Sequence, residues 1–170
     1  QFASHTKIID LGNDFRLLKD KDFDGKSFVY GLPELNKTDI KNAQYIANPG
    51  CFATAIQLAL LPLASHGLLN DDVHINATTG STGAGVGLAA TSHFSWRNNN
   101  MSHYKAFNHQ HLGEIIQSVN QLQADYTNEL IFVPNRGDFA RGIFATLYTT
   151  VDENLEDIVA KYEDFYKDQP

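Results

Sequence analysis

Asn48-Pro49-Gly50-Cys51-Phe52-Ala53-Thr54 carries the single cysteine of this chain and joins two segments of different pattern. The run before it, 43–47, is short and largely apolar like a buried strand, and the segment from Phe52 to about Leu61 is typical of a helix. Cys51 is therefore expected at a strand-to-helix corner, where unpaired N–H groups and a partial positive charge stabilise a thiolate. This predicts a nucleophilic cysteine, although a small, buried and unreactive cysteine fits the same position.

Size and composition exclude several classes of protein. The 170 residues, 42% of them hydrophobic, are enough for one domain with a hydrophobic core. A net charge of −7 without a basic run argues against nucleic acid as a partner. One cysteine excludes an internal disulfide and fits a reducing compartment, and no stretch has the length and apolarity of a membrane span or a signal peptide. A cytoplasmic protein is expected, and because the chain starts at Gln1 without a Met we expect a fragment of a longer one.

The order of strand-like and helix-like segments predicts an α+β or α/β fold with a mixed or largely antiparallel sheet. Strands are expected at 7–12, 43–47, 73–78, 130–133 and 143–151, and helices from Phe52, from His109 and from Asp152 or Asn154. Pro62 is expected to kink or restart the first helix, and 134–138 to form a turn. Residues 91–108 lack a clear period and are expected to form a long ordered loop of functional type.

A glycine-rich loop, Gly80-Ser81-Thr82-Gly83-Ala84-Gly85-Val86-Gly87, follows one of the expected strands. Its small residues allow close approach of a ligand, and its N–H groups can bind anions, although simple flexibility explains the same composition. The loop does not open a helix, so it is not interpreted as a dinucleotide-binding fingerprint.

His109 and His111 are the best candidates among seven histidines for the proton partner of Cys51. Because they are two residues apart their side chains face different ways, and only one is expected to reach the thiol. Glu114 shares a helix face with His111 and is expected to orient its imidazole and raise its pKa. Cys51, His111 and Glu114 would then be nucleophile, base and orienting group, whereas a surface helix cap is the alternative. A histidine pair alone is thin support for zinc, so no metal site is expected.

Two arginines, Arg97 and Arg141, are candidate anion-binding residues because a guanidinium binds carboxylate or phosphate through two hydrogen bonds. Lys105 would act as a point charge. A solvated surface charge is the alternative for each of them, more so for Lys105 than for Arg141.

Six motifs together resemble the N-acetyl-gamma-glutamyl-phosphate reductase family of arginine biosynthesis. In order, they are Asp10-Leu11-Gly12-Asn13-Asp14-Phe15-Arg16-Leu17, Tyr30-Gly31-Leu32-Pro33-Glu34-Leu35, Asn48-Pro49-Gly50-Cys51, Gly80-Ser81-Thr82-Gly83-Ala84-Gly85, His109-Gln110-His111-Leu112-Gly113-Glu114-Ile115 and Arg141-Gly142. The resemblance implies a domain similar to the C-terminal domain of glyceraldehyde-3-phosphate dehydrogenase, with a mostly antiparallel or mixed sheet and helices on one face. Residues 1–33 would be the trailing segment of a missing Rossmann nucleotide domain, and 34–170 the catalytic and dimerisation domain.

The resemblance also implies an NADPH-dependent reduction of an acyl phosphate to an aldehyde through a thioester on Cys51. His111 would be the acid and base, paired with Glu114. The implied substrate-binding residues are His109, Tyr104, Arg97, Arg141, Ser81 and Gly83. The implied cofactor-binding residues are Asn48, Gly50, Gly83 and Gly85, although the missing domain would hold most of NADP. The implied partners are the acyl phosphate, inorganic phosphate and further copies of the chain, in a dimer or tetramer.

Two positions depart from the family pattern: Val86 stands where many relatives have Arg or Lys, and Asn135 where many have His. Both put contacts to substrate or phosphate in doubt, and Arg97 or Arg141 is expected to compensate. The alternatives are an aspartate-semialdehyde-type dehydrogenase, which the His-x-His-x-x-Glu run disfavours, and a non-catalytic dimerisation module. The acyl group, acetyl or larger, and the choice between NADPH and NADH stay open.

Overall fold

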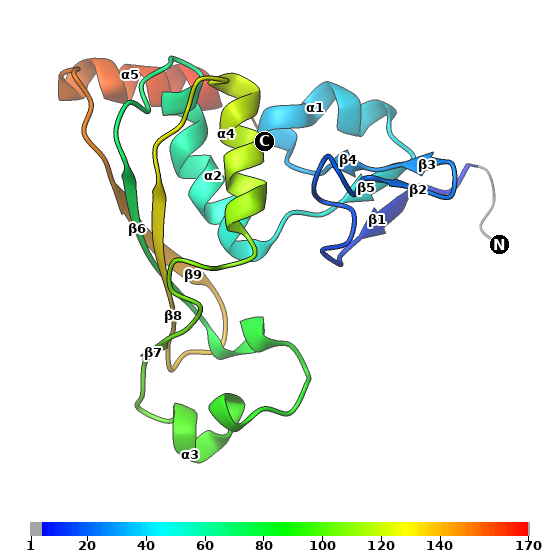
Figure 1. Cartoon of the computed structure of the whole chain (residues 1–170), viewed down its shortest axis with the longest axis vertical. Helices are drawn as coiled ribbons and strands as arrows, with labels where there is room; N and C mark the ends of the chain where they lie inside the picture. Colours follow the sequence, from blue (N-terminus) through cyan, green and yellow to red (C-terminus); the bar gives the residue numbers. More distant parts are fainter. Residues whose placement is uncertain (1–4, 170) are drawn as a thin grey trace.

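A computed structural model describes residues 5–169 of the protein, and Figure 1 shows the two larger sheets on opposite sides of helices α2 and α4, with a separate β2–β3 hairpin. In chain order the elements are β1 (Ile8–Asp10), β2 (Asp22–Phe23), β3 (Lys26–Ser27), β4 (Val29–Tyr30), α1 (Pro33–Asn42), β5 (Tyr45–Ala47), α2 (Cys51–Ala64), β6 (Val73–Thr79), the 3-10 helices η1 (Ser81–Ala84) and η2 (Ala90–Ser92), α3 (Phe94–Arg97), β7 (Ser102–His103), α4 (Leu112–Leu122), β8 (Leu130–Arg136), β9 (Ile143–Tyr148) and α5 (Leu155–Tyr166). None of the helices within residues 5–169 is long and apolar enough to cross a bilayer.

The larger sheet has four strands in the order β7-β8-β6-β9. Strand β6 is parallel to β8 and antiparallel to β9, and β7 is antiparallel to β8, so the sheet is mixed. Helices α2 and α4 lie side by side against one face, and α5 packs against α2 (Figure 1). The expected α+β fold, with a mixed sheet and helices on one face, is confirmed.

Strand β6 shows why one face of this sheet is covered and the other is open. Its buried residues alternate with more exposed ones, and Val73, Ile75 and Ala77 point into the core. The core between sheet and helices includes Phe52, Ile56, Ile115, Val119 and Phe132. On the opposite face, β9 presents aromatic side chains, and the exposed fractions of Phe144 and Tyr148 are 74% and 62%. The open face therefore exposes aromatic side chains of β9 beside polar side chains such as His74 and Asn76 of β6.

The smaller sheet, in the order β1-β5-β4, is entirely parallel and leads into the cysteine. Strand β5 ends at Ala47, and Asn48-Pro49-Gly50 turns the chain into α2, which begins at Cys51. The expected strand-to-helix corner is thus confirmed. Strands of this sheet come from both sides of residue 33, and the division of the chain into domains there stays a prediction.

Helix α2 continues through Pro62 to Ala64, so the expected kink or restart at Pro62 is wrong. Pro62 has no N–H to donate to the carbonyl of Leu58, four residues earlier. The hydroxyl of Tyr166 on α5 donates a hydrogen bond to that carbonyl instead. The proline is therefore accommodated because a side chain of another helix satisfies the freed acceptor.

Strand β8 also continues through a proline, so the expected turn at 134–138 starts too early. Pro134 pairs with Ala77 of β6, and its carbonyl accepts from the N–H of Tyr104 on the other side. The N–H and C=O of one residue point to the same side of a strand, so the missing donor faces the irregular segment at Tyr104 and not β6. As a result the strand extends to Arg136.

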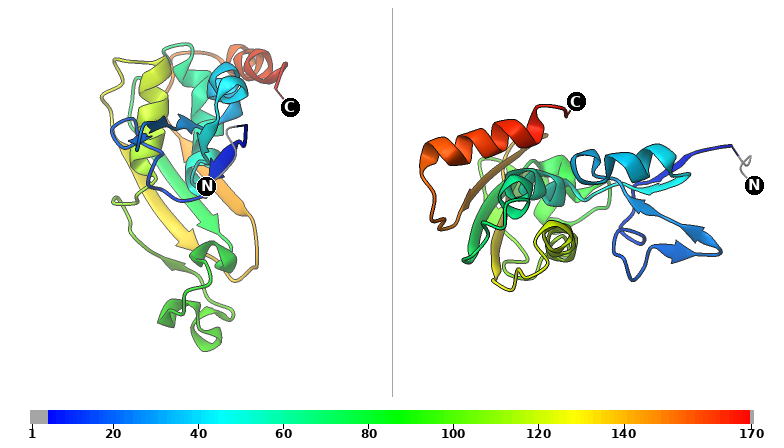
Figure 2. Two further views of the ribbon diagram at one scale, coloured as in Figure 1. Left: turned by 90° about the vertical axis from the view of Figure 1, so that its right-hand side faces the viewer. Right: turned by 90° about the horizontal axis from the view of Figure 1, so that it is seen from above.

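Residues 81–103 form an arm that projects beyond the end of the larger sheet (Figure 2, left). The arm contains η1, η2 and α3, and β7 returns the chain to the edge of the larger sheet, so the expected long loop at 91–108 is ordered in short helices and one short strand. Arg97 holds it together: only 5% of this residue is exposed, and its guanidinium donates to the carbonyls of Thr91, Asn100 and Arg136. These hydrogen bonds give the arm a defined structure and attach it to β8.

Candidate active site

Cys51 is the first residue of α2, and its side chain is free and exposed. The residue before it, Gly50, has extended backbone angles and no side chain to cap the helix. The N–H groups of the first turn and the positive end of the 14-residue helix therefore act on the sulfur. An exposed cysteine at the first position of a helix is a candidate nucleophile.

His111 lies directly over the turn that precedes Cys51. A Cβ atom placed on Gly50 would lie 2.3 Å from Nε2 of His111, much closer than any real contact. Only glycine allows the imidazole to approach the backbone this closely. The structure thus brings His111, from the N-terminus of α4, next to the residue that adjoins Cys51.

The side chain of Glu114 contacts the turn before Cys51 and residues from three other parts of the chain. Its carboxylate accepts hydrogen bonds from the N–H of Gly50 at 2.9 Å and from the hydroxyl of Tyr30 at 2.9 Å. It also accepts one from Nη1 of Arg16 at 3.2 Å, and Nε2 of His111 is 4.0 Å away. Only 3% of Glu114 is exposed, so these partners compensate for the loss of water around a buried charge.

Sequence reasoning missed Arg16, Tyr30 and Gln57 as members of this network. Gln57, on α2, donates from Nε2 to the hydroxyl of Tyr30 at 2.8 Å and is fully buried. Arg16 and Tyr30 lie in two of the family motifs quoted above, but the sequence analysis assigned neither residue a role. A signal was present, because a buried carboxylate needs a cation and Arg16 lies in one of those motifs.

Both candidate histidines are neutral at pH 7. Burial lowers the pKa of His109 to about 4, and repulsion by His111 when it is protonated and by the charge of Lys105 adds to this effect. Burial and the charges of Arg16 and Lys105 lower the pKa of His111 to about 4 as well. The expectation that Glu114 raises the pKa of His111 is therefore wrong, because burial and the charges of the nearby cations lower this pKa.

The two imidazoles lie 4.5 Å apart, with His109 in an aromatic setting. Nδ1 of His109 accepts from the backbone N–H of His111 at 3.2 Å, which leaves its Nε2 to carry the proton in the neutral form. Nδ1 of His111 is buried and has no hydrogen-bond partner within residues 5–169. His111 therefore has a ring nitrogen that no contact of the described protein engages.

Tyr104 connects the histidines to Arg136. Its ring lies 5.7 Å from that of His109, and Cζ of Arg136 lies 4.8 Å from the centroid of the Tyr104 ring. Burial raises the pKa of Tyr104, Arg136 opposes this, and the charge of Cys51 adds to the increase. Cys51 is therefore close enough to act on the Tyr104 hydroxyl, and Arg136 belongs to the same site, although sequence reasoning assigned it no role.

Other expected site residues lie apart from this group or are engaged in the fold. Arg97 directs its guanidinium to backbone carbonyls of the arm, and Arg141 is exposed on the β8–β9 turn. Asn48 donates from its side chain to the carbonyl of Pro49. Asn135, which was expected only as a departure from the family pattern, is 9% exposed and donates to the side chain of Asn76. For Arg97, Arg141 and Asn48 a ligand-binding role remains a prediction.

The glycine-rich loop begins as η1 at the end of β6. Ser81 donates from Oγ to the carbonyl of Phe139 at 3.2 Å, and Gly83 and Gly85 are exposed. Gly85 has φ +76°, which glycine adopts without strain, and no atom lies within 4 Å of a Cβ placed there. The loop is thus open for a ligand or for another part of a larger protein.

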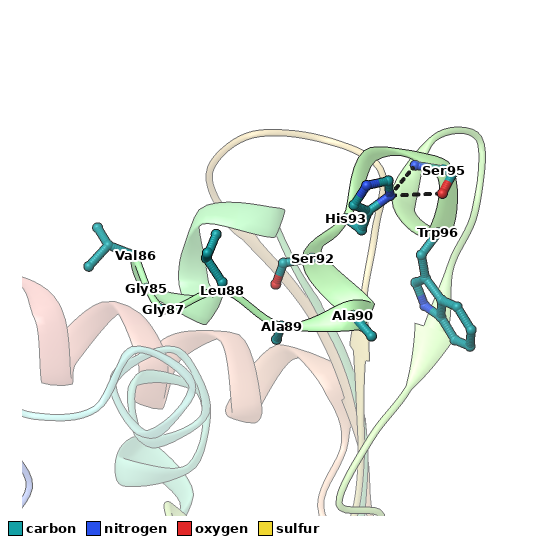
Figure 3. A pocket seen from close by; sticks show the side chains of 10 residues that line it. All are labelled: Gly85, Val86, Gly87, Leu88, Ala89, Ala90, Ser92, His93, Ser95 and Trp96. Atoms are coloured by element: carbon teal, nitrogen blue, oxygen red, sulfur yellow. Dashed lines mark hydrogen bonds between the residues drawn. The ribbon is translucent and has the colours of Figure 1, made fainter.

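A separate hollow of about 770 Å³ lies in the arm (Figure 3). Small and apolar residues line it, including Val86, Leu88, Ala90 and Trp96. His93 and Ser95 also line it, and Nδ1 of His93 lies 2.8 Å from Oγ of Ser95. The hollow is lined by the hydroxyl residues Ser92 and Ser95 but not by Cys51, His109 or His111, so it is separate from the group around the cysteine. No cluster of three metal-ligating side chains occurs in the described part of the chain.

Comparison with known proteins gives one family and many relatives. The model of the semialdehyde dehydrogenase dimerisation domain matches residues 51–170. A protein named N-acetyl-gamma-glutamyl-phosphate reductase from Flavobacterium johnsoniae is 78% identical over all 170 residues, which cover 52% of its own length. Proteins of the same name from Christiangramia forsetii and Bacteroides fragilis are 62% and 61% identical, over 99% and 94% of this chain and 51% and 48% of their lengths. The chain spans about half the length of the curated relatives it matches.

Solved structures show the same fold at low sequence identity. Aspartate semialdehyde dehydrogenase II from Vibrio cholerae superposes with a TM-score of 0.65 at 14% identity, over 92% of this chain and 52% of that one. A probable aspartate-semialdehyde dehydrogenase from Pseudomonas aeruginosa gives a TM-score of 0.55 at 14% identity, over 96% and 53%. These structures identify the architecture and not the substrate.

Proposed function

The chain belongs to the semialdehyde dehydrogenase dimerisation-domain family, and from this premise we propose that it is the catalytic part of an N-acetyl-gamma-glutamyl-phosphate reductase. The whole enzyme would reduce N-acetyl-gamma-glutamyl phosphate to N-acetylglutamate semialdehyde. The observation that carries the proposal is Cys51, exposed at the first position of α2, beside a turn that His111 covers. Names of relatives at 57–78% identity favour this substrate over aspartate semialdehyde.

In the proposed reaction, the neutral imidazole of His111 takes the proton of the Cys51 thiol. The thiolate attacks the acyl carbon, the C–O bond to the phosphoryl group breaks, and inorganic phosphate leaves with the bonding electron pair. A thioester on Cys51 results, and phosphate is a good leaving group for this step. The helix N-terminus stabilises negative charge on the sulfur and on the substrate oxygen as each develops.

NADPH, when bound, supplies the hydride that reduces the thioester carbon. The protonated imidazole of His111 then returns its proton to the former carbonyl oxygen, and collapse of the thiohemiacetal frees the aldehyde and Cys51. In this chain the backbones of Gly50, Gly83 and Gly85 would contact the cofactor, and the open space around Gly85 is compatible with that role. We place the rest of the cofactor site outside residues 34–170, in a nucleotide domain that 1–33 completes.

We further propose that two copies associate through the open face of the larger sheet. Phe144 and Tyr148 are exposed there, and the ring of His74 stacks on Tyr148 with the centroids 5.3 Å apart. Apolar and aromatic groups on an uncovered sheet face are typical of a subunit interface, and the family is described as a dimerisation domain. We propose the cytoplasm as the location, because a reducing compartment keeps Cys51 as a thiol.

The test is the reverse reaction of the full-length protein that carries this chain. With N-acetylglutamate semialdehyde and NADP, reduction of the cofactor should depend on inorganic phosphate and disappear when Cys51 is alkylated or replaced in Cys51→Ser. Turnover of aspartate semialdehyde in its place would identify the sister enzyme, and turnover of neither would leave a non-catalytic dimerisation module. Because the hydride donor is held elsewhere, residues 1–170 alone should show no NADPH-dependent activity.

A further inference from the structure

Arg136 stands at the edge of the Cys51 site on the larger sheet. It is the last residue of β8, paired with Thr79 of β6 and Ser102 of β7. Its guanidinium lies 4.8 Å from the ring centroid of Tyr104, which lies 5.7 Å from His109. Arg136 is therefore one aromatic side chain away from the catalytic histidines.

The guanidinium of Arg136 interacts with the side chain of Tyr104 but has, in the described part of the chain, no carboxylate partner and no backbone carbonyl partner of the kind that engages the other arginines near the site. Arg16 is paired with Glu114, and Arg97 donates to backbone carbonyls. Nε of Arg136 is buried without a hydrogen-bond partner, and no carboxylate within residues 5–169 forms a salt bridge with it. A buried donor without an acceptor is costly, so the site is built for an acceptor that arrives with a ligand.

We propose that Arg136 binds an anionic oxygen group of the substrate while Tyr104 holds the guanidinium plane in place. A planar guanidinium binds the oxygens of a phosphoryl or carboxylate group through two parallel hydrogen bonds, and stacking on an aromatic ring fixes its orientation. The group is either the phosphoryl group that leaves or a carboxylate that remains on the aldehyde. This assignment rests on the proposed function, and it names the residue that anchors the substrate.

The first experiment does not depend on turnover. In the full-length protein, the rate of alkylation of Cys51 is followed by mass spectrometry of its peptide, with anionic iodoacetate and with neutral iodoacetamide. In Arg136→Gln the ratio of the iodoacetate rate to the iodoacetamide rate should fall about threefold or more, because a positive charge near the sulfur is lost. Arg136→Lys should keep the ratio, and so should Lys41→Gln, which removes one exposed charge on α1.

Protection of Cys51 distinguishes the two sources of the anionic group. If Arg136 holds the phosphoryl group, inorganic phosphate slows alkylation, and Arg136→Gln weakens this protection and raises the KM for phosphate by about 10- to 100-fold. If it holds a carboxylate, N-acetylglutamate protects, and the same variant raises the KM for the semialdehyde by a similar factor. A distorted site would instead change both alkylation rates together and lower kcat.

The proposal is overturned if Arg136→Gln leaves the alkylation ratio, both protection constants and both KM values within about twofold of the wild-type values. Absence of turnover by the wild type with N-acetylglutamate semialdehyde would instead refute the proposed function. In that case the alkylation ratio and the protection by phosphate or by N-acetylglutamate still decide whether Arg136 binds an anion beside Cys51.

Discussion

The carboxylate of Glu114 accepts a hydrogen bond of 2.9 Å from the backbone N–H of Gly50, the residue that precedes Cys51. The same carboxylate binds Arg16 and Tyr30, which come from the first 30 residues of the chain. Glu114 is therefore a positioning residue for the corner that presents Cys51, more than a partner of His111 alone. Its hydrogen bond to Gly50 connects α4 to the turn before α2. The same side chain therefore helps to position both Cys51 and His111.

Removal of one partner from the buried pair of Arg16 and Glu114 should destabilise the protein. Arg16→Met leaves the carboxylate of Glu114 without its cation, at a cost of about 3 kcal/mol in the free energy of unfolding. The double variant Arg16→Met with Glu114→Gln should recover part of this loss, because no unpaired charge remains. Urea unfolding of the three variants gives the coupling, and strict additivity of the two single changes would contradict the pairing.

Gly50→Ala should reduce activity without unfolding the protein. The added Cβ would fall 2.3 Å from Nε2 of His111, so the imidazole or the turn has to move away from Cys51. We expect kcat to fall by about 100-fold or more, the scale of losing a positioned acid–base group. Gly113→Ala, at the second residue of α4, is the matched control, because its Cβ would make only ordinary contacts with Leu17. Equal activity of both variants would contradict the close approach of His111 to Gly50.

The corner at Cys51 was predictable from sequence because it depends on neighbours in the chain. A short apolar run, an Asn-Pro-Gly turn and a helical segment specify it locally, and the spacing of His111 and Glu114 places them on one helix face by the same kind of rule. The partners of Glu114 were not predictable this way: Arg16 lies 98 residues away, and no periodic pattern connects the two. Arg136 was missed because Pro134 was interpreted as the end of a strand that continues beyond it.

The histidines should make stability decrease in acid. Their pKa values are about 4 in the folded protein and about 6.5 in an unfolded chain, so the unfolded chain binds more protons between these values. Stability from this source is complete above pH 6.5 and falls as the pH decreases to 4, by at most about 1.4 kcal/mol per pH unit for each histidine. Urea midpoints at pH 7.5, 6.5, 5.5 and 4.5 measure the slope. His109→Asn should flatten it, and an unchanged slope in this variant would show that His109 does not carry the effect.

The open sheet face should determine the oligomeric state. Phe144→Asp places a charge at the centre of the proposed interface, where it would be buried without a partner. We expect the molar mass from light scattering of the full-length protein to fall to that of a smaller assembly, with the fold retained by circular dichroism. Phe23→Asp changes another exposed phenylalanine, on the β2–β3 hairpin, and should not alter the mass. An unchanged mass in Phe144→Asp would place the interface elsewhere.

Tyr166 should contribute more to stability than its neighbour Tyr162, although each donates one hydrogen bond from α5 to a carbonyl of α2. The acceptor of Tyr162 is Ala59, whose carbonyl also has the N–H of Leu63 available one helical turn later. The acceptor of Tyr166 is Leu58, for which that position is Pro62, so the hydroxyl is the donor that replaces the missing N–H. Tyr166→Phe should therefore lower the free energy of unfolding by about 1–3 kcal/mol, the penalty of an unsatisfied buried carbonyl, and Tyr162→Phe by about 1 kcal/mol or less.

In a background with Pro62→Ala the helix regains its own donor, and the two tyrosine changes should then cost the same. A difference that persists in that background would show that Tyr166 acts through packing and not through the carbonyl of Leu58.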